Sequence, residues 1–222
     1  HADVLIEGFR PGELARLGFA DEILHGHNPR LIICHLSGFG QQGADAQRAG
    51  HDLGYGARAG LYTRTREARH PAPVYPPVAD HAAGLRAFAM ICAALYQREK
   101  NRQGEVLDIS IVEALQDWNY VFASDGLRQR VSGAQACYNI YRCADDRYIT
   151  LSALEPKFWR AFCEAVERPG WIDRHAEAMP QQGLIDALAT LFASRTQAQW
   201  QADLGRVDCC FEIVPDLKDL GI

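Results

Sequence analysis

Two short apolar runs separated by helical segments constrain the fold of this chain most. Residues 2–7 (ADVLIE) and residues 30–36 (RLIICHL) each have the length and composition of a buried strand. Between them, Pro11 stands at an early position of one predicted helix, and Asp21 is predicted to cap a second. A strand, a helical crossover and a second strand form a β–α–β unit. Because such crossovers join parallel strands, the sequence predicts a parallel sheet.

Three further helices and one strand are predicted after this unit. Residues 50–61 and 112–122 have helical patterns, and residues 106–111 alternate as a strand. The longest helical pattern covers residues 82–99. Its predicted apolar face consists of Leu85, Phe88, Ala89, Cys92, Leu95 and Tyr96. The proline-containing residues 64–77 before that helix are predicted to be extended and exposed.

A change in composition at residues 125–135, which are rich in Gly, Arg, Gln and Ser, predicts a domain boundary. We therefore expect a large domain over residues 1–125 and a small domain over residues 126–222. The small domain is predicted to contain hairpin strands at 138–142 and 147–152, helices at 156–167, 181–193 and 197–204, and a last strand at 211–214. The predicted fold is α/β, a parallel-sheet domain followed by a small α+β domain.

Charge and composition exclude several classes of partner. The net charge is −5 and no block of Lys or Arg stands out, so no nucleic-acid surface is expected. The longest apolar run, residues 85–96, is interrupted by Arg86 and falls short of the roughly 20 residues that cross a bilayer, so no membrane partner is expected. The seven cysteines show no zinc-like spacing. We expect no metal site, and we expect buried thiols in a reducing cytoplasm.

The two ends of the sequence look like internal positions. The chain opens with HADVLIEG, without an initiator Met, and stops at Ile222 without a tail. We expect it to be an internal fragment of a longer protein, in which case terminal signals cannot decide its localisation.

Four features fall in or near loops that follow predicted strands: Arg10, the glycine-containing residues 38–43, His51 and Asp80. Parallel sheets bind ligands at such loops. Each feature also has a structural interpretation. The glycines can permit a tight turn, His51 can be bonded within its loop, and Asp80 can be the N-cap of the helix at 82–99. The residues alone leave both interpretations open.

Four blocks of the sequence resemble the class III CoA-transferase superfamily, which also contains the α-methylacyl-CoA racemases. They are residues 2–12 (ADVLIEGFRPG) with 16–18 (RLG), residues 28–55 (with SGFGQ and AGHDLGY), residues 77–80 (PVAD) with 104–114 (GEVLDISIVEA), and residues 138–158 (with YNIYRCADDRY and ALEPKF). The blocks follow the superfamily's order over nearly the whole chain. Gly50-His51-Asp52 is similar to the racemase branch, because CoA-transferases generally lack a His at this position.

The resemblance implies an acid/base pair. It places His51 and Asp80 on opposite sides of the α-carbon of an acyl-CoA, where inversion by 1,1-proton transfer needs a base on one face and an acid on the other. Glu155 matches a small-domain carboxylate that lies near this His across a dimer interface, where it would orient the imidazole. The alternative for Glu155 is a first-turn residue favoured by the helix dipole.

The resemblance also implies contacts with CoA. Arg10 and Arg16 match arginines that hold CoA phosphates, a role suited to forked and permanently charged donors; the alternative is a solvated helix face. The other implied contacts are Gly50, Asp52, Leu53, Gly54 and Tyr55. The expected substrate is an acyl-CoA, with no cofactor beyond its CoA moiety. The large domain should be Rossmann-like but incomplete, and the protein an interlocked homodimer.

Three functions stay open. The first is racemisation or epimerisation of a 2-methylacyl-CoA. The second is CoA transfer, in which Asp80 attacks the thioester and forms a mixed anhydride. The third is CoA binding without catalysis. His51 favours the first, whereas His81-Ala82-Ala83-Gly84, which replaces the glycine-rich run usual in the racemases, supports the other two.

Overall fold

The computed structural model describes residues 2–62, 73–118, 130 and 133–221. The chain divides into two compact units, residues 1–123 and 124–222, which we describe separately. Three predictions lie outside the described residues: most of the boundary segment 125–135, the greater part of the exposed segment 64–77, and the end of the helix predicted at 112–122.

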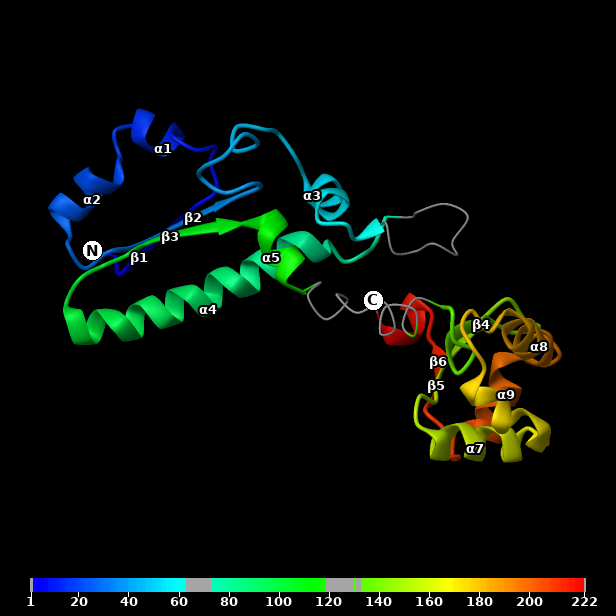
Figure 1. Ribbon diagram of the computed structural model, residues 1–222. Helices are drawn as coiled ribbons and strands as arrows, with labels where there is room; N and C mark the ends of the chain where they lie inside the picture. Colours follow the sequence, from blue (N-terminus) through cyan, green and yellow to red (C-terminus); the bar gives the residue numbers. More distant parts are fainter. Residues whose placement is uncertain (1, 63–72, 119–129, 131–132, 222) are drawn as a thin grey trace. The chain divides into compact units, whose positions relative to one another are not determined.

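The first unit is built on a three-stranded parallel sheet (Figure 1). Its strands are β1 (Val4–Glu7), β2 (Ile32–Ser37) and β3 (Val106–Ser110), in the order β1-β2-β3. The helices are α1 (Glu13–Arg16) and α2 (Asp21–His27) between β1 and β2, α3 (Asp52–Arg58) and α4 (Val78–Asn101) between β2 and β3, and α5 (Ile111–Trp118). The predicted parallel sheet is confirmed.

Helices cover both sides of this sheet: α1 and α2 lie along one side and α4 along the other (Figure 1). Buried Ile32 and Cys34 of β2 and Ile109 of β3 share one core with α4. The helix contributes a stripe of small side chains to that core, namely Ala79, Ala82, Ala83, Ala87 and Ala94. Small side chains let the helix backbone approach the sheet closely.

The predicted apolar face of α4 is wrong. Leu85, Phe88 and Tyr96 are 60–68% exposed, and of the predicted face only Leu95 packs against the core. The helix is apolar on two sides, so hydrophobic periodicity alone did not distinguish them. The alanine stripe occupies the buried side because larger side chains would hold the helix away from the strands.

Helix α4 is also more apolar than the sequence analysis allowed. By length and hydropathy alone it meets the criterion for a membrane span, although core helices of other proteins meet it too. Because its alanine stripe packs against β2 and β3, we describe it as a helix of the α/β unit.

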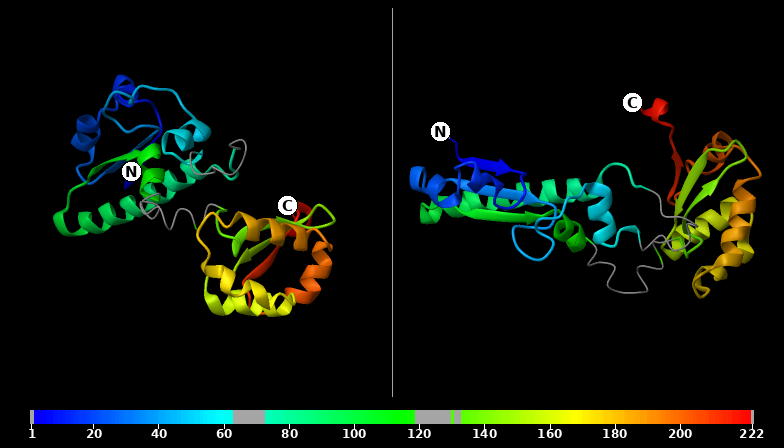
Figure 2. Two further views of the ribbon diagram at one scale, coloured as in Figure 1. Left: turned by 45° about the vertical axis from the view of Figure 1, so that its right-hand side comes forward. Right: turned by 90° about the horizontal axis from the view of Figure 1, so that it is seen from above.

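The second unit contains an antiparallel sheet with helices on one face, as Figure 2 shows. The strands are β4 (Tyr138–Arg142), β5 (Tyr148–Ser152) and β6 (Phe211–Val214), and the helices are α7 (Pro156–Ala165), α8 (Gln182–Phe192) and α9 (Gln197–Leu204). Buried Trp159, Phe162, Phe192 and Trp200 fill the space between them. The predicted hairpin, helices and last strand are all confirmed.

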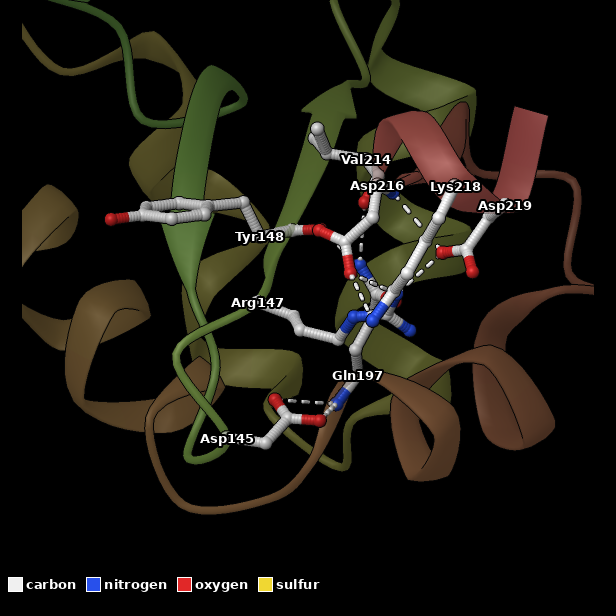
Figure 3. Close-up of polar contacts among 8 residues, drawn as sticks. All are labelled: Asp145, Arg147, Tyr148, Gln197, Val214, Asp216, Lys218 and Asp219. Atoms are coloured by element: carbon white, nitrogen blue, oxygen red, sulfur yellow. Dashed lines mark hydrogen bonds and ion pairs between the residues drawn. The ribbon is translucent and has the colours of Figure 1, made fainter. Parts of the chain in front are cut away.

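A polar network fastens the ends of this sheet together (Figure 3). The side chain of Gln197, which is 2% exposed, donates hydrogen bonds to the carbonyl oxygens of Tyr148 (2.6 Å) and Val214 (3.0 Å). The guanidinium of Arg147 binds the carboxylates of Asp216 (2.7 Å) and Asp219 (2.5 Å) in the segment that follows β6. The network therefore links the hairpin, α9 and the end of the chain.

Candidate active site

A cavity of about 630 Å³ opens at the carboxyl ends of the parallel strands. It is lined by residues 8–11 after β1, by residues 36–38 at the end of β2, by Ala46, Arg48, Ala49, Gly50, His51 and Tyr55, and by Ile111. Parallel sheets commonly bind ligands at this position. A cavity suited to a ligand therefore lies among the loops after the strands, where the sequence predicted the site.

Tyr55 forms a wall of this cavity, and its ring leaves room only for glycine at two of the lining positions. Its hydroxyl donates a hydrogen bond to the carbonyl oxygen of Gly50 (2.8 Å). Its ring contacts the Phe39 ring edge to face, with the two ring centroids 5.5 Å apart. A Cβ atom added at Gly38 or Gly50 would overlap the Tyr55 ring. These glycines are needed at both positions because an aromatic ring lies against the backbone.

Asp52 joins the two helix starts that carry the candidate catalytic residues. It is the first residue of α3, and His51 is the N-cap of that helix. The Oδ1 atom of Asp52 accepts hydrogen bonds from the backbone nitrogens of Ala79 (2.7 Å) and Asp80 (3.0 Å) in the first turn of α4. The carboxylate of one helix therefore caps the next, and the residues beside it become neighbours.

The interpretation of Asp80 as an N-cap is wrong. Helix α4 begins at Val78 with Pro77 as N-cap, so Asp80 lies within the first turn. The capping oxygen comes instead from Asp52, which belongs to another helix. The side chain of Asp80 is thus free of the capping role and reaches solvent.

The surroundings of Asp80 raise its pKa. Partial burial is the main cause, and the nearby charge of Asp52 adds to it, whereas His51 and His81 act in the opposite direction. The charge of Asp80 in turn contributes to a raised pKa for Tyr55, after the larger effect of burial. These couplings put Asp80 within electrostatic reach of both His51 and Tyr55, which line the cavity. Asp80 itself borders a shallower depression with His81 and Gly84.

The segment that departs from the racemase pattern has a structural explanation. Ala82 and Ala83 are fully buried in the alanine stripe of α4, and they face the core of the unit. His81 is exposed, and its Nδ1 lies 2.7 Å from the carbonyl oxygen of Pro77. The two alanines therefore serve the packing of α4 against the core.

Of the two predicted CoA-binding arginines, one lines the cavity. Arg10 does so from the loop after β1. Arg16 is not among the lining residues; its guanidinium is exposed and binds Glu13 at 2.8 Å. The cavity instead contains Arg48, which lies over the Phe39 ring and binds Asp45 at 3.0 Å. Arg48 immediately precedes the matched segment that starts at Ala49, a proximity that could have drawn attention to it.

The remaining predicted residues divide between the cavity and other places. Gly50 and Tyr55 line it, and Asp52 supports it through α4. Leu53 and Gly54 are exposed on α3 and do not contribute to the lining. Glu155 is the N-cap of α7 in the second unit. Its implied role beside His51 stays a prediction.

Among the described residues, no group of three His, Cys, Asp or Glu side chains is arranged to hold a metal ion. All seven cysteines are free thiols.

The family model described as CoA-transferase family III matches residues 1–221. The chain belongs to this family. The human protein named alpha-methylacyl-CoA racemase is 30% identical to it over 94% of the chain. A Mycobacterium tuberculosis protein named probable fatty acyl-CoA transferase is 30% identical over 90% of the chain, and a Caenorhabditis elegans CaiB/baiF CoA-transferase family protein is 30% identical over 99%. The chain spans 57–67% of the length of these family III relatives.

Solved structures of family III proteins share the fold. A crystal structure of the mycobacterial protein Rv3272 matches with a TM-score of 0.79 and 28% identity, covering 99% of this chain and 62% of that one. A CaiB/BaiF family protein from Brucella suis matches with a TM-score of 0.80 and the same coverage; at 23% identity it supports the fold alone. The α/β fold class is therefore established.

Proposed function

We propose that this family III chain forms the catalytic part of an enzyme that racemises or epimerises 2-methylacyl-CoA thioesters. The observation that supports this most is the arrangement of His51 and Asp80. One lines the cavity, and the other is held in its electrostatic reach by the hydrogen bonds from α4 to Asp52. A proton-transfer pair needs both groups close to one carbon atom.

The proposed step moves a proton from one face of the α-carbon to the other. One group removes the α-proton, and the electron pair of the broken C–H bond moves into the thioester carbonyl to give an enolate. The other group then delivers a proton to the opposite face, and the carbonyl re-forms. The raised pKa of Asp80 brings this carboxyl closer to neutral pH, which favours its use as an acid as well as a base.

The cationic side chains of the cavity suit the CoA part of the substrate. Arg10 and Arg48 line the same cavity as His51, and guanidinium groups bind phosphates with paired hydrogen bonds. A cavity of about 630 Å³ is within the range of sites that bind small molecules. We therefore assign the CoA phosphates to Arg10 and Arg48, and we no longer assign them to Arg16.

The alternative is transfer of CoA between carboxylic acids. In this reaction the Asp80 carboxylate attacks the thioester carbonyl and CoA thiolate leaves, giving a mixed anhydride. The thiolate then attacks the Asp80 carbonyl and releases the donor acid, which leaves an aspartyl-CoA thioester. An acceptor carboxylate attacks that thioester, and the CoA thiolate released from it attacks the acceptor carbonyl of the second anhydride, which gives the acceptor's CoA thioester and restores Asp80. Relatives named acyl-CoA transferase, at 30% identity, favour this alternative. The hydrogen bonds that join Asp52, the residue after His51, to the helix turn that carries Asp80 favour racemisation.

The proposal extends to partners and location. We propose a homodimer in which Glu155 of one subunit orients His51 of the other; the exposed apolar residues of α4 support association. We propose a cytoplasmic enzyme without a metal, and seven free thiols support a reducing compartment.

One incubation distinguishes the two reactions. The protein is mixed with a single enantiomer of a 2-methylacyl-CoA in D2O, with and without a carboxylic acid acceptor. Deuterium at the α-carbon without an acceptor supports racemisation, whereas CoA found on the acceptor supports transfer. CoA binding without either product would leave a binding protein.

His51→Ala tests the mechanism. Racemisation predicts that α-exchange falls by about 10²–10⁴-fold, the usual contribution of a general acid or base, while CoA binding is kept. Exchange at the wild-type rate would remove His51 from the mechanism.

A further inference from the structure

A buried histidine next to the proposed site bridges two carboxylates. The Nδ1 atom of His35, in β2, lies 2.5 Å from Oε1 of Glu7, in β1. Its Nε2 atom lies 3.0 Å from Oδ2 of Asp21, the first residue of α2. His35 and Glu7 are both less than 10% exposed. Asp21 was predicted to cap this helix, but the N-cap is Ala20 and the Asp21 carboxylate faces His35.

The geometry favours a cationic histidine. Both ring nitrogens face carboxylate oxygens, and only the imidazolium form can donate a hydrogen bond from each. Burial of the ring works to lower the pKa of His35, but the hydrogen bonds and charges of Glu7 and Asp21 outweigh it and raise that pKa. One positive charge therefore stands between two negative charges.

This cluster is attached to the loop that carries Arg10. The second carboxylate oxygen of Glu7 accepts a hydrogen bond from the backbone nitrogen of Phe9 at 2.7 Å. The next residue, Arg10, lines the 630 Å³ cavity with His51. It also lines a smaller cavity of about 230 Å³ whose walls include Glu7, Asp21 and His35. Arg10 thus lines both the proposed CoA site and the smaller cavity that contains the two carboxylates.

The charges around His35 come from several elements. Glu7 faces it from β1 and Asp21 from α2, and Asp108 of β3 is its neighbour in the sheet register. The Asp108 carboxylate is engaged by the backbone nitrogen of Gln41 at 2.9 Å. Glu22 and Arg10 complete the charged lining of the smaller cavity. Without the histidine cation, acidic groups would dominate this side of Arg10.

We propose that His35, as a cation, neutralises Glu7 and Asp21 and thereby keeps Arg10 available to the acyl-CoA cavity. His35 is then a positioning residue, since it acts through Arg10 and touches no substrate. The inference rests on the proposed function, because Arg10 is taken to bind a CoA phosphate. Uncompensated carboxylates would attract the Arg10 guanidinium and compete with the phosphate for it.

The sign of the pH dependence follows from the raised pKa of His35. The cation is fully present below the ordinary histidine pKa and is lost as pH rises through the higher value in the folded protein. CoA affinity should therefore fall as pH rises through that value. Phosphate groups of CoA are already ionised above pH of about 7, so their own titration does not produce this fall.

The experiment measures the dissociation constant of CoA by calorimetry between pH 7 and 9. His35→Gln should weaken CoA binding about tenfold at pH 7, the loss expected when one charge-assisted hydrogen bond to a phosphate is removed. Adding Glu7→Gln and Asp21→Asn to that variant should restore the affinity, because the competing carboxylates are gone. The Glu7→Gln/Asp21→Asn variant should bind CoA with a flat pH profile.

Controls separate positioning from loss of structure. His25→Gln, in α2, changes a histidine whose Nε2 lies 2.9 Å from the Leu31 carbonyl oxygen and which lines neither cavity, and it should leave CoA affinity unchanged. Thermal unfolding of each variant reports its folded fraction. If His35→Gln does not fold, Asp21→Asn alone, at a partly exposed position, should raise CoA affinity at pH 9 relative to wild type.

Two results would overturn the inference. A triple variant as weak as His35→Gln, or an Asp21→Asn variant with wild-type affinity at pH 9, would show that the carboxylates do not compete for Arg10. Absence of CoA binding by the wild-type protein at every pH would overturn the proposed function as well. CoA binding that changes neither with pH nor with these substitutions would overturn only the positioning role of His35.

Discussion

The Oδ1 atom of Asp52 lies 3.0 Å from the backbone nitrogen of Asp80, and this hydrogen bond helps to join the helix that follows His51 to the helix that carries Asp80. Neither residue is close to the other in the sequence. The distance between the two proposed catalytic groups is therefore controlled by a residue that need not react.

Substitutions of Asp52 should separate its capping of α4 from the effect of its charge on Asp80. Asp52→Ala removes the acceptor of two backbone N–H groups and should cost about 1 kcal/mol of the free energy of unfolding. Asp52→Asn keeps an acceptor oxygen but removes the charge that helps to raise the pKa of Asp80. That pKa should fall, so the acidic limb of the pH–rate profile for α-exchange should move to lower pH. An unmoved limb with Asp52→Asn would contradict this coupling.

The glycines under Tyr55 should tolerate no side chain. Gly38→Ala and Gly50→Ala each place a Cβ atom in the Tyr55 ring, and each should lower the free energy of unfolding by about 1–3 kcal/mol, as overpacking does. Gly54→Ala is the matched control in α3, because its added Cβ atom meets no other group. It should be neutral or stabilising by up to about 1 kcal/mol. Denaturant titrations of the three variants measure the difference.

Two arginines provide a direct test of which one binds CoA. Arg48→Ala should weaken CoA binding by about tenfold or more, because a charge-assisted hydrogen bond is lost from the cavity. Arg16→Ala, on the exposed surface of α1, should leave the dissociation constant unchanged. Calorimetric titration with CoA compares them. Equal losses in the two variants would mean that the cavity is not where the phosphates bind.

Gln197 should be a stability determinant of the second unit. Gln197→Leu removes the buried side-chain donor that bonds the carbonyl oxygens of Tyr148 and Val214, and it should cost about 1–3 kcal/mol in the free energy of unfolding. Gln182→Ala, at an exposed position of α8, should cost no more than about 0.5 kcal/mol. Chemical unfolding followed by tryptophan fluorescence reports on this unit, which contains Trp159 and Trp200.

The strands and most helices were predictable because their patterns are local. The two apolar runs around Leu5 and Ile33 are long enough for a strand and too short for a helix, and the crossover between them leaves only a parallel arrangement. The buried face of α4 was not predictable in this way. Both sides of that helix are apolar, and the choice between them depends on how closely a sheet defined by distant residues approaches.

The candidate site was predictable from its residue types but not from its connections. The resemblance identified His51 and Arg10, which line one cavity, and Asp80, which borders a shallower depression. It gave no indication that Asp52 caps α4 or that Arg48 replaces Arg16 in the lining, since both depend on tertiary contacts. His35 was overlooked because its two acidic partners lie 28 and 14 positions away.

The ring of Tyr55 also restricts which substitutions this sequence can accept during evolution. While the ring lies against Gly38 and Gly50, neither glycine can acquire a side chain, and a smaller residue at position 55 would leave a hole in the cavity wall. The three positions are therefore epistatic, and a change at one becomes acceptable only after a change at another. Related sequences are therefore expected to differ at these sites by pairs of compensating substitutions and not by single ones.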